Sequence, residues 1–159
     1  MCSEESFSDT IINVEDSGLI IYGEIFMDTG DRLFEEQLKS HCCSETIMNL
    51  ALEDMGWDED ARYHLVKSMG AFCGGLHEML TCGSLCAAKA VLFLAEGDGS
   101  KTSQELGAEL MEWFKDRYGS WTCRDLLEND PTRKPSICPG IIGDTYMKLH
   151  EMLEDIGAV

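Results

Sequence analysis

The sequence predicts an all-α fold, a compact bundle of about five to seven helices, on three observations. From Asp31 onward, apolar residues recur at helical spacing, and glycines or capping residues separate the periodic segments. Segment 84–96 is apolar on nearly every side, which is typical of a central, buried helix. Residues 1–30 lack this pattern. The chain therefore divides into an N-terminal appendage, residues 1–30, and a cysteine-rich helical domain, residues 31–159.

The appendage carries the one strand signal of the sequence. Two β-branched segments, residues 11–14 and 19–22, flank the turn-like stretch 15–18. This arrangement favours a small β-hairpin, and a bent helix is the alternative.

Three helices follow in the first half of the domain. We expect a short helix from Asp31, a second over 44–55 that ends at Gly56, and a third from Asp58 or Glu59 to Gly70. Their predicted apolar faces are Leu33, Phe34 and Leu38; Ile47, Met48, Ala51, Leu52 and Met55; and Leu65, Val66 and Met69.

The second half begins with a glycine-bearing loop, residues 71–83, and the buried helix 84–96. After the break at 97–99 we expect an amphipathic helix over 103–118, with Leu106, Leu110, Trp113 and Phe114 inward and Gly119 at its end. A short helix over 123–127, a loop over 129–135 and a last helix over 139–156 complete the prediction.

Charge limits the function classes. Twelve basic and thirty acidic side chains give a formal charge of −18, which argues against binding to nucleic acid or to an anionic membrane surface. The acidic N-terminus does not resemble a signal peptide, and the longest apolar run, residues 85–95, contains Lys89 and is too short to span a bilayer. We expect a cytoplasmic protein whose protein partner carries a basic patch, with a homodimer as an open alternative.

The eight cysteines are unusual for a protein of a reducing compartment. No two have Cys-x-x-Cys spacing, which argues against a thioredoxin-type motif, a zinc knuckle and a bacterial ferredoxin motif. A metal site would have to be assembled from distant segments, and the alternative is that the cysteines are small buried hydrophobes.

Four of the cysteines lie at or next to predicted helix N-termini: Cys43, Cys82, Cys123 and Cys138. A helix N-terminus offers unpaired N–H groups and the positive end of the helix dipole. Both favour a thiolate, which is the form that binds metals and attacks disulfides. If these helix ends converge, they supply the field that four clustered sulfurs need.

The domain resembles a family of proteins described as redox-active and named for a pattern of Cys, Cys-Gly-Ala-x-x-Gly, Cys and Cys. The resemblance covers roughly residues 31–157 and rests on Arg32-Leu33-Phe34, Cys43-Ser44-Glu45-Thr46, Phe72-Cys73-Gly74-Gly75, Cys82-Gly83-Ser84-Leu85-Cys86-Ala87, residues 114–120, Cys123-Arg124-Asp125-Leu126-Leu127 and Cys138. Ser84 stands where the motif has Ala, and Ala87 where it has its last Gly. The resemblance assigns the four defining cysteines to Cys43, Cys82, Cys123 and Cys138. It implies redox activity, and a related module in a multihaem protein is associated with an iron–sulfur centre.

Our leading hypothesis is that these four cysteines bind an iron–sulfur cluster, with [2Fe–2S] favoured over [4Fe–4S]. The alternatives are a metal-free dithiol/disulfide oxidoreductase and a structural zinc site. Cys73 and Cys86 are second-rank ligands, and Cys86 could replace Cys82 because it lies one turn further along the same helix.

The remaining cysteines and histidines receive lesser roles. Cys2 and Cys42 look incidental, although Cys42 is an alternative to the adjacent Cys43. His41 and His77 could each replace a cysteine ligand, but such residues are more often surface groups.

Overall fold

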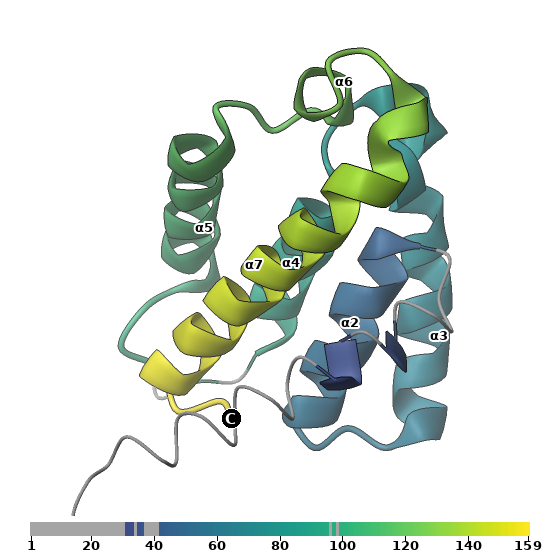
Figure 1. Ribbon diagram of the computed structural model, residues 1–159. Coiled ribbons are helices and arrows are strands. Elements are labelled where there is room, and N and C mark those ends of the chain that lie inside the picture. The colour runs from purple at the N-terminus through teal and green to yellow at the C-terminus, as the bar shows by residue number, and fades with distance from the viewer. Residues whose placement is uncertain (1–30, 34, 37–41, 96, 98) are drawn as a thin grey trace, which may run out of the picture.

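The computed structural model describes residues 31–33, 35–36, 42–95, 97 and 99–159. These residues form helices and their connections, with no β-strand among them beyond one isolated bridge between Thr81 and Thr122, and the all-α prediction is confirmed (Figure 1). The predicted hairpin within 1–30 and His41 lie outside the described residues.

The helices follow the predicted order, and most begin and end within two residues of their predicted bounds. They are α2 (Cys43–Asp54), α3 (Glu59–Met69), α4 (Gly83–Leu94), α5 (Ser103–Tyr118), α6 (Cys123–Leu126) and α7 (Lys134–Asp155). Short irregular turns connect them: η1 (Gly70–Phe72), η2 (Gly75–Met79) and η3 (Pro131–Arg133).

Helix α4 is the centre of the bundle, as its apolar composition predicts. It packs against α2, α5 and α7, and Figure 1 shows α7 in front of it with α5 and α2 on opposite sides. Its buried residues are Gly83, Ser84, Leu85, Ala87, Ala88, Val91 and Leu92. The small ones allow neighbouring helices to approach closely, and each large side chain fully buried contributes about 1.5–3 kcal/mol.

Local capping explains why two of these helices begin where they do. Asp58 accepts a hydrogen bond from the Ala61 backbone N–H at the start of α3. Thr102 and Glu105 form a reciprocal capping box at the start of α5, and Gly119 ends that helix in the left-handed conformation. These short-range signals are readable from sequence.

The predicted start of the last helix is wrong. Helix α7 begins at Lys134 rather than Pro139, and Pro139 lies inside it. Pro135 occupies the first turn, where its missing N–H costs nothing, and Pro139 forfeits only the bond to the Pro135 carbonyl. Cys138 therefore lies in the second turn of α7 rather than at a helix N-terminus.

Candidate functional site

A cavity of about 450 Å³ lies among α2, α4, α6 and the start of α7. Six cysteines line it: Cys42, Cys43, Cys73, Cys82, Cys123 and Cys138. All four predicted ligands are thus brought to one hollow from segments far apart in the chain, and second-rank Cys73 joins them. Cys86, the other second-rank residue, is half-buried on α4 and is not part of the lining.

A short antiparallel backbone contact sets Cys82 beside Cys123. The Cys82 N–H donates to the Trp121 carbonyl at 2.8 Å, and the Cys123 N–H donates to the Leu80 carbonyl at 2.7 Å. These bonds continue the bridge between Thr81 and Thr122 and hold the starts of α4 and α6 together. The two side chains are close enough to hydrogen-bond each other.

Backbone N–H groups point at three of the sulfurs, as the helix-end argument predicts. The first-turn N–H of Ser44 and the loop N–H of Gly74 hydrogen-bond the Cys43 sulfur and lower its pKa. The first turn of α4 provides such donors to two more cysteines. The N–H groups of Ser84 and Leu85 hydrogen-bond the Cys82 sulfur, the N–H of Gly83 hydrogen-bonds the Cys123 sulfur, and these bonds lower the pKa of each thiol. Backbone donors therefore surround the cavity where α2 and α4 begin.

Burial and crowding nevertheless outweigh these donors for most of the thiols. The pKa of Cys43 is raised by burial and then by Cys82, and that of Cys82 is raised by the hydrogen bond to Cys123 and by burial. Burial, Cys43 and Cys82 raise the pKa of Cys138 to about 11. Among the four predicted ligands only Cys123 has a lowered pKa, because the Cys82 thiol donates a hydrogen bond to its sulfur. The helix-end donors thus lower the thiol pKa values as expected, but burial and the neighbouring sulfurs outweigh them for Cys43 and Cys82.

The chemistry of these four thiols suits a metal centre, although no three of them are close enough to hold a single ion in the described part of the chain. Four thiolates repel one another in a half-buried hollow, and a cation or cationic cluster removes the repulsion and deprotonates the thiols outright. The Ser84 hydroxyl is a second sign of fit: it is buried without a partner of ordinary geometry, and it faces the Cys43 sulfur closely enough to lower that thiol's pKa.

Lys134 was missed by the sequence reasoning. It lines the cavity and lowers the pKa of Cys138, and its ammonium lies 3.0 Å from the position that a Cβ on Gly74 would take. Lys134 and Cys138 are four residues apart on α7 and so share a face. An earlier predicted start for this helix would have revealed the pair.

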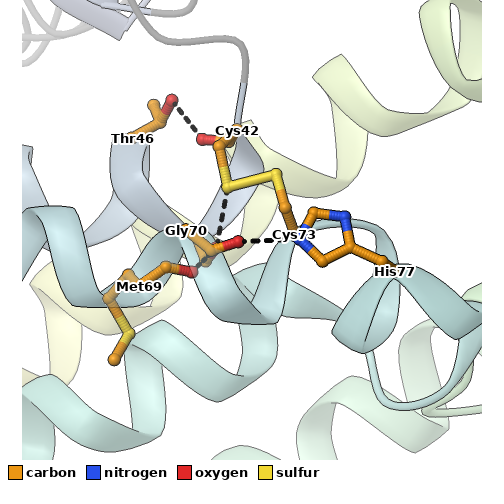
Figure 2. The surroundings of a disulfide bond; sticks show 7 residues. Cys42, Thr46, Met69, Gly70, Cys73 and His77 are labelled. Atoms are coloured by element: carbon orange, nitrogen blue, oxygen red, sulfur yellow. Dashed lines mark hydrogen bonds between the residues drawn. A yellow bond between two sulfur atoms is a disulfide. The ribbon is translucent and has the colours of Figure 1, made fainter.

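A disulfide joins Cys42 to Cys73, whose Cα atoms are 5.4 Å apart (Figure 2). Cys42 is therefore not incidental. In the disulfide form neither Cys42, the alternative to Cys43, nor second-rank Cys73 has a free thiol that could bind a metal. The bond connects the N-cap of α2 to the loop after η1, a sequence separation of 31 residues. Nothing in the spacing of these cysteines could have predicted the pairing.

No group of three or more His, Cys, Asp or Glu side chains in the described part of the chain is arranged to hold a metal ion. A single tetrahedral zinc needs thiolate sulfurs about 3.8 Å apart, because each Zn–S bond is about 2.3 Å long. A [2Fe–2S] cluster needs two such close pairs, one pair on each iron, with a wider spacing between the pairs. His77 is exposed outside the cavity lining and contacts the Gly70 carbonyl at 3.1 Å.

Comparison with known proteins gives one match. Residues 41–152 match a family model described as "putative redox-active protein (C_GCAxxG_C_C)". None of the curated proteins and none of the solved structures compared with the chain match it.

No helix in the described ranges is both long enough and apolar enough to cross a membrane.

Proposed function

The chain belongs to the C_GCAxxG_C_C family, described as redox-active, and on that premise we propose that it transfers electrons through an iron–sulfur cluster. The proposed ligands are Cys43, Cys82, Cys123 and Cys138, with [2Fe–2S] favoured over [4Fe–4S]. The observation that carries the proposal is the convergence of these four free cysteines, from four separate segments, on one cavity of about 450 Å³.

The chemistry of the cavity supports the same assignment. Burial and mutual repulsion keep most of the thiols protonated, so the metal-free site is an unfavourable place for four negative sulfurs. A cluster, when bound, supplies one-electron transfer at a potential that its charge and the hydrogen bonds to its sulfurs determine. The N–H groups of Ser44, Gly74 and Gly83 are in place to provide such hydrogen bonds to the cysteine sulfurs.

The chain's own residues would also control access to the site. Leu126, Ile141 and Ile142 form apolar lining that limits water, and Lys134 provides positive charge in the cavity lining. The excess of acidic side chains elsewhere favours a partner with a basic patch, docked by weak and salt-sensitive contacts. A cytoplasmic location and a homodimer stay predictions.

A metal-free dithiol/disulfide oxidoreductase is the second candidate, and the contact between Cys82 and Cys123 favours it. The Cys82 thiol donates a hydrogen bond to the Cys123 sulfur, and two adjacent thiols are the reduced form that such an oxidoreductase would need. A structural zinc site is the third candidate. Among the described residues no three possible ligands are placed to hold a single ion, so the structure does not favour this candidate.

The experiment is a set of single Cys→Ser variants at positions 43, 82, 123 and 138, purified without oxygen and analysed for iron, sulfide and zinc. Each should lose most of its iron, whereas Cys86→Ser, at a cysteine outside the lining, should keep it. Wild-type iron in all four variants would overturn the proposal. A colourless protein with about one zinc per chain would favour the structural site, and a metal-free protein whose thiols cycle would favour the oxidoreductase.

A further inference from the structure

The geometry points to a second redox site in the same cavity: the Cys42–Cys73 disulfide exchanges two electrons with an external dithiol. The bond lines the hollow that the four free cysteines line, yet it belongs to none of the proposed ligands. This exchange activity goes beyond the proposed electron transfer, and it requires no metal.

The two residues of this bond differ in exposure, which we take to decide where a thiolate can attack. The Cys42 residue is 6% exposed, whereas Cys73 is partly exposed at the start of a surface loop. Thiol–disulfide exchange requires in-line approach to one sulfur, so accessibility selects Cys73 as the attacked atom and Cys42 as the leaving group.

The surroundings of Cys42 suit a leaving thiolate. Cys42 is the N-cap of α2, where unpaired N–H groups and the helix dipole favour negative charge. Its sulfur lies 3.0 Å from the buried Ser44 hydroxyl, which in the disulfide form donates to the Met69 carbonyl at 2.7 Å. When the bond opens, this hydroxyl can turn to the new thiolate, or a Cys42 thiol can donate to it.

The backbone around the bond is fixed on one side and adaptable on the other. The Cys42 carbonyl accepts bonds from both the N–H and the hydroxyl of Thr46, each at 3.1 Å, so this end stays in place (Figure 2). Cys73 leads into a loop with positive φ at Gly74, Gly75, Leu76, His77 and Met79. Left-handed conformations are unfavourable for non-glycine residues, and opening the bond removes one constraint on this loop.

The reaction balances without any further reagent. A thiolate of the dithiol attacks the Cys73 sulfur, a mixed disulfide forms, and the Cys42–Cys73 bond breaks with its electron pair going to Cys42. The second thiol of the reagent, once deprotonated, attacks the mixed disulfide, closes a disulfide within the reagent and releases the Cys73 thiolate. The two protons of the reagent end on Cys42 and Cys73 through solvent. A monothiol has no second thiol in the same molecule, so Cys42 reverses the first step unless another thiol molecule attacks the mixed disulfide.

The positive charge of Lys134 would attract the thiolate of the dithiol to the disulfide. Its ammonium lies beside Gly74, the residue after Cys73, and it also lines the cavity. A positive charge at this point attracts an incoming thiolate in a protein that is otherwise strongly acidic. The dithiol can be a small molecule or a vicinal pair on a protein, and the two sources require separate arms in the test.

The first test uses the native full-length protein. It is equilibrated without oxygen in mixtures of reduced and oxidised dithiothreitol, quenched in acid and alkylated, and Cys42 and Cys73 are quantified by peptide mass spectrometry. Both thiols should appear together and disappear together as the mixture is changed. A bond that is reduced only after unfolding in urea would overturn the proposal. In a parallel arm, rapid reduction by reduced thioredoxin identifies a protein dithiol as the source, and reduction by dithiothreitol alone identifies a small one.

The second test determines which of the two sulfurs is the more reactive. In Cys42→Ser the remaining Cys73 should form a mixed disulfide with hydroxyethyl disulfide roughly tenfold faster than Cys42 does in Cys73→Ser. Equal rates, or a faster Cys42, would contradict the assignment; Cys2→Ser is the matched control. Both variants should keep the iron content of the wild type. Loss of iron in Cys42→Ser would make Cys42 a cluster ligand and would overturn its assignment as the leaving group of the disulfide. Absence of iron from every protein would end the cluster proposal alone, because these thiol readouts do not depend on iron.

Discussion

Gly83, the second residue of the Cys-Gly motif, lies directly against the sulfur of Cys43 from another helix. A Cβ at Gly83 would come within 2.9 Å of Cys43 Sγ and within 2.6 Å of the Phe72 carbonyl oxygen. The φ angle of Gly83 is not in the left-handed region, so the requirement for glycine is spatial rather than conformational. The missing side chain is what allows the start of α4 to approach the Cys43 sulfur.

Gly83→Ala should therefore displace Cys43 or the Phe72 backbone. We expect a loss of about 1–3 kcal/mol in the free energy of unfolding, measured in urea, together with loss of bound iron. Gly140→Ala is the matched control, because Gly140 lies within α7 and a Cβ there meets nothing within 4 Å. The control should gain about 0.5–1 kcal/mol, since alanine favours helix. Equal behaviour of the two variants would contradict the close approach.

Ser84→Ala restores the residue that the family motif has at this position. In the metal-free protein it removes a buried hydroxyl without a regular partner and should raise the free energy of unfolding by about 1 kcal/mol. Ser44→Ala is the contrasting variant, because its buried hydroxyl donates to Met69 and should cost about 1 kcal/mol when lost. Urea unfolding compares the two, and a loss of stability in Ser84→Ala would show that the hydroxyl is well satisfied.

The raised pKa of Cys86 predicts a fall in stability at alkaline pH. Burial, then Cys82 and Cys43, raise this pKa from 9.0 to about 11, against the opposing effect of Lys89. The folded thiol thus keeps its proton after the unfolded one has lost it, so its contribution is complete below pH 9.0 and is lost as pH rises towards about 11. Urea unfolding of metal-free Cys86→Ala should show a smaller decrease over this range than wild type or Cys2→Ser does. Equal decreases would contradict the shift.

The parts of the fold that follow from local signals could be predicted. Asp58 and Thr102 begin helices by accepting hydrogen bonds from N–H groups three residues on, and Gly119 ends one through its left-handed conformation. The last helix was predicted too short because Pro139 fits the first position of a helix equally well. Its true start depends on Pro135, whose position in the first turn tolerates a proline for the same reason.

The candidate site shows the same difference between features set by local sequence signals and features set by long-range packing. Helix starts and the resemblance selected Cys43, Cys82, Cys123 and Cys138, and all four line one cavity. The first three lie at helix starts as predicted, whereas Cys138 lies in the second turn of α7. The pairing of Cys42 with Cys73 and the presence of Lys134 in the lining depend on how distant segments pack. Neither leaves a periodic or spacing signal in a single sequence.

The proposed function depends most on whether the four thiols at positions 43, 82, 123 and 138 hold iron and sulfide. The direct measurement is iron and acid-labile sulfide per chain in protein purified without oxygen, with the visible absorption spectrum recorded on the same sample. A brown protein with iron and sulfide in equal amounts, about two of each per chain, is the predicted result for a [2Fe–2S] cluster. A colourless protein that takes up neither iron nor sulfide on anaerobic reconstitution would contradict the account.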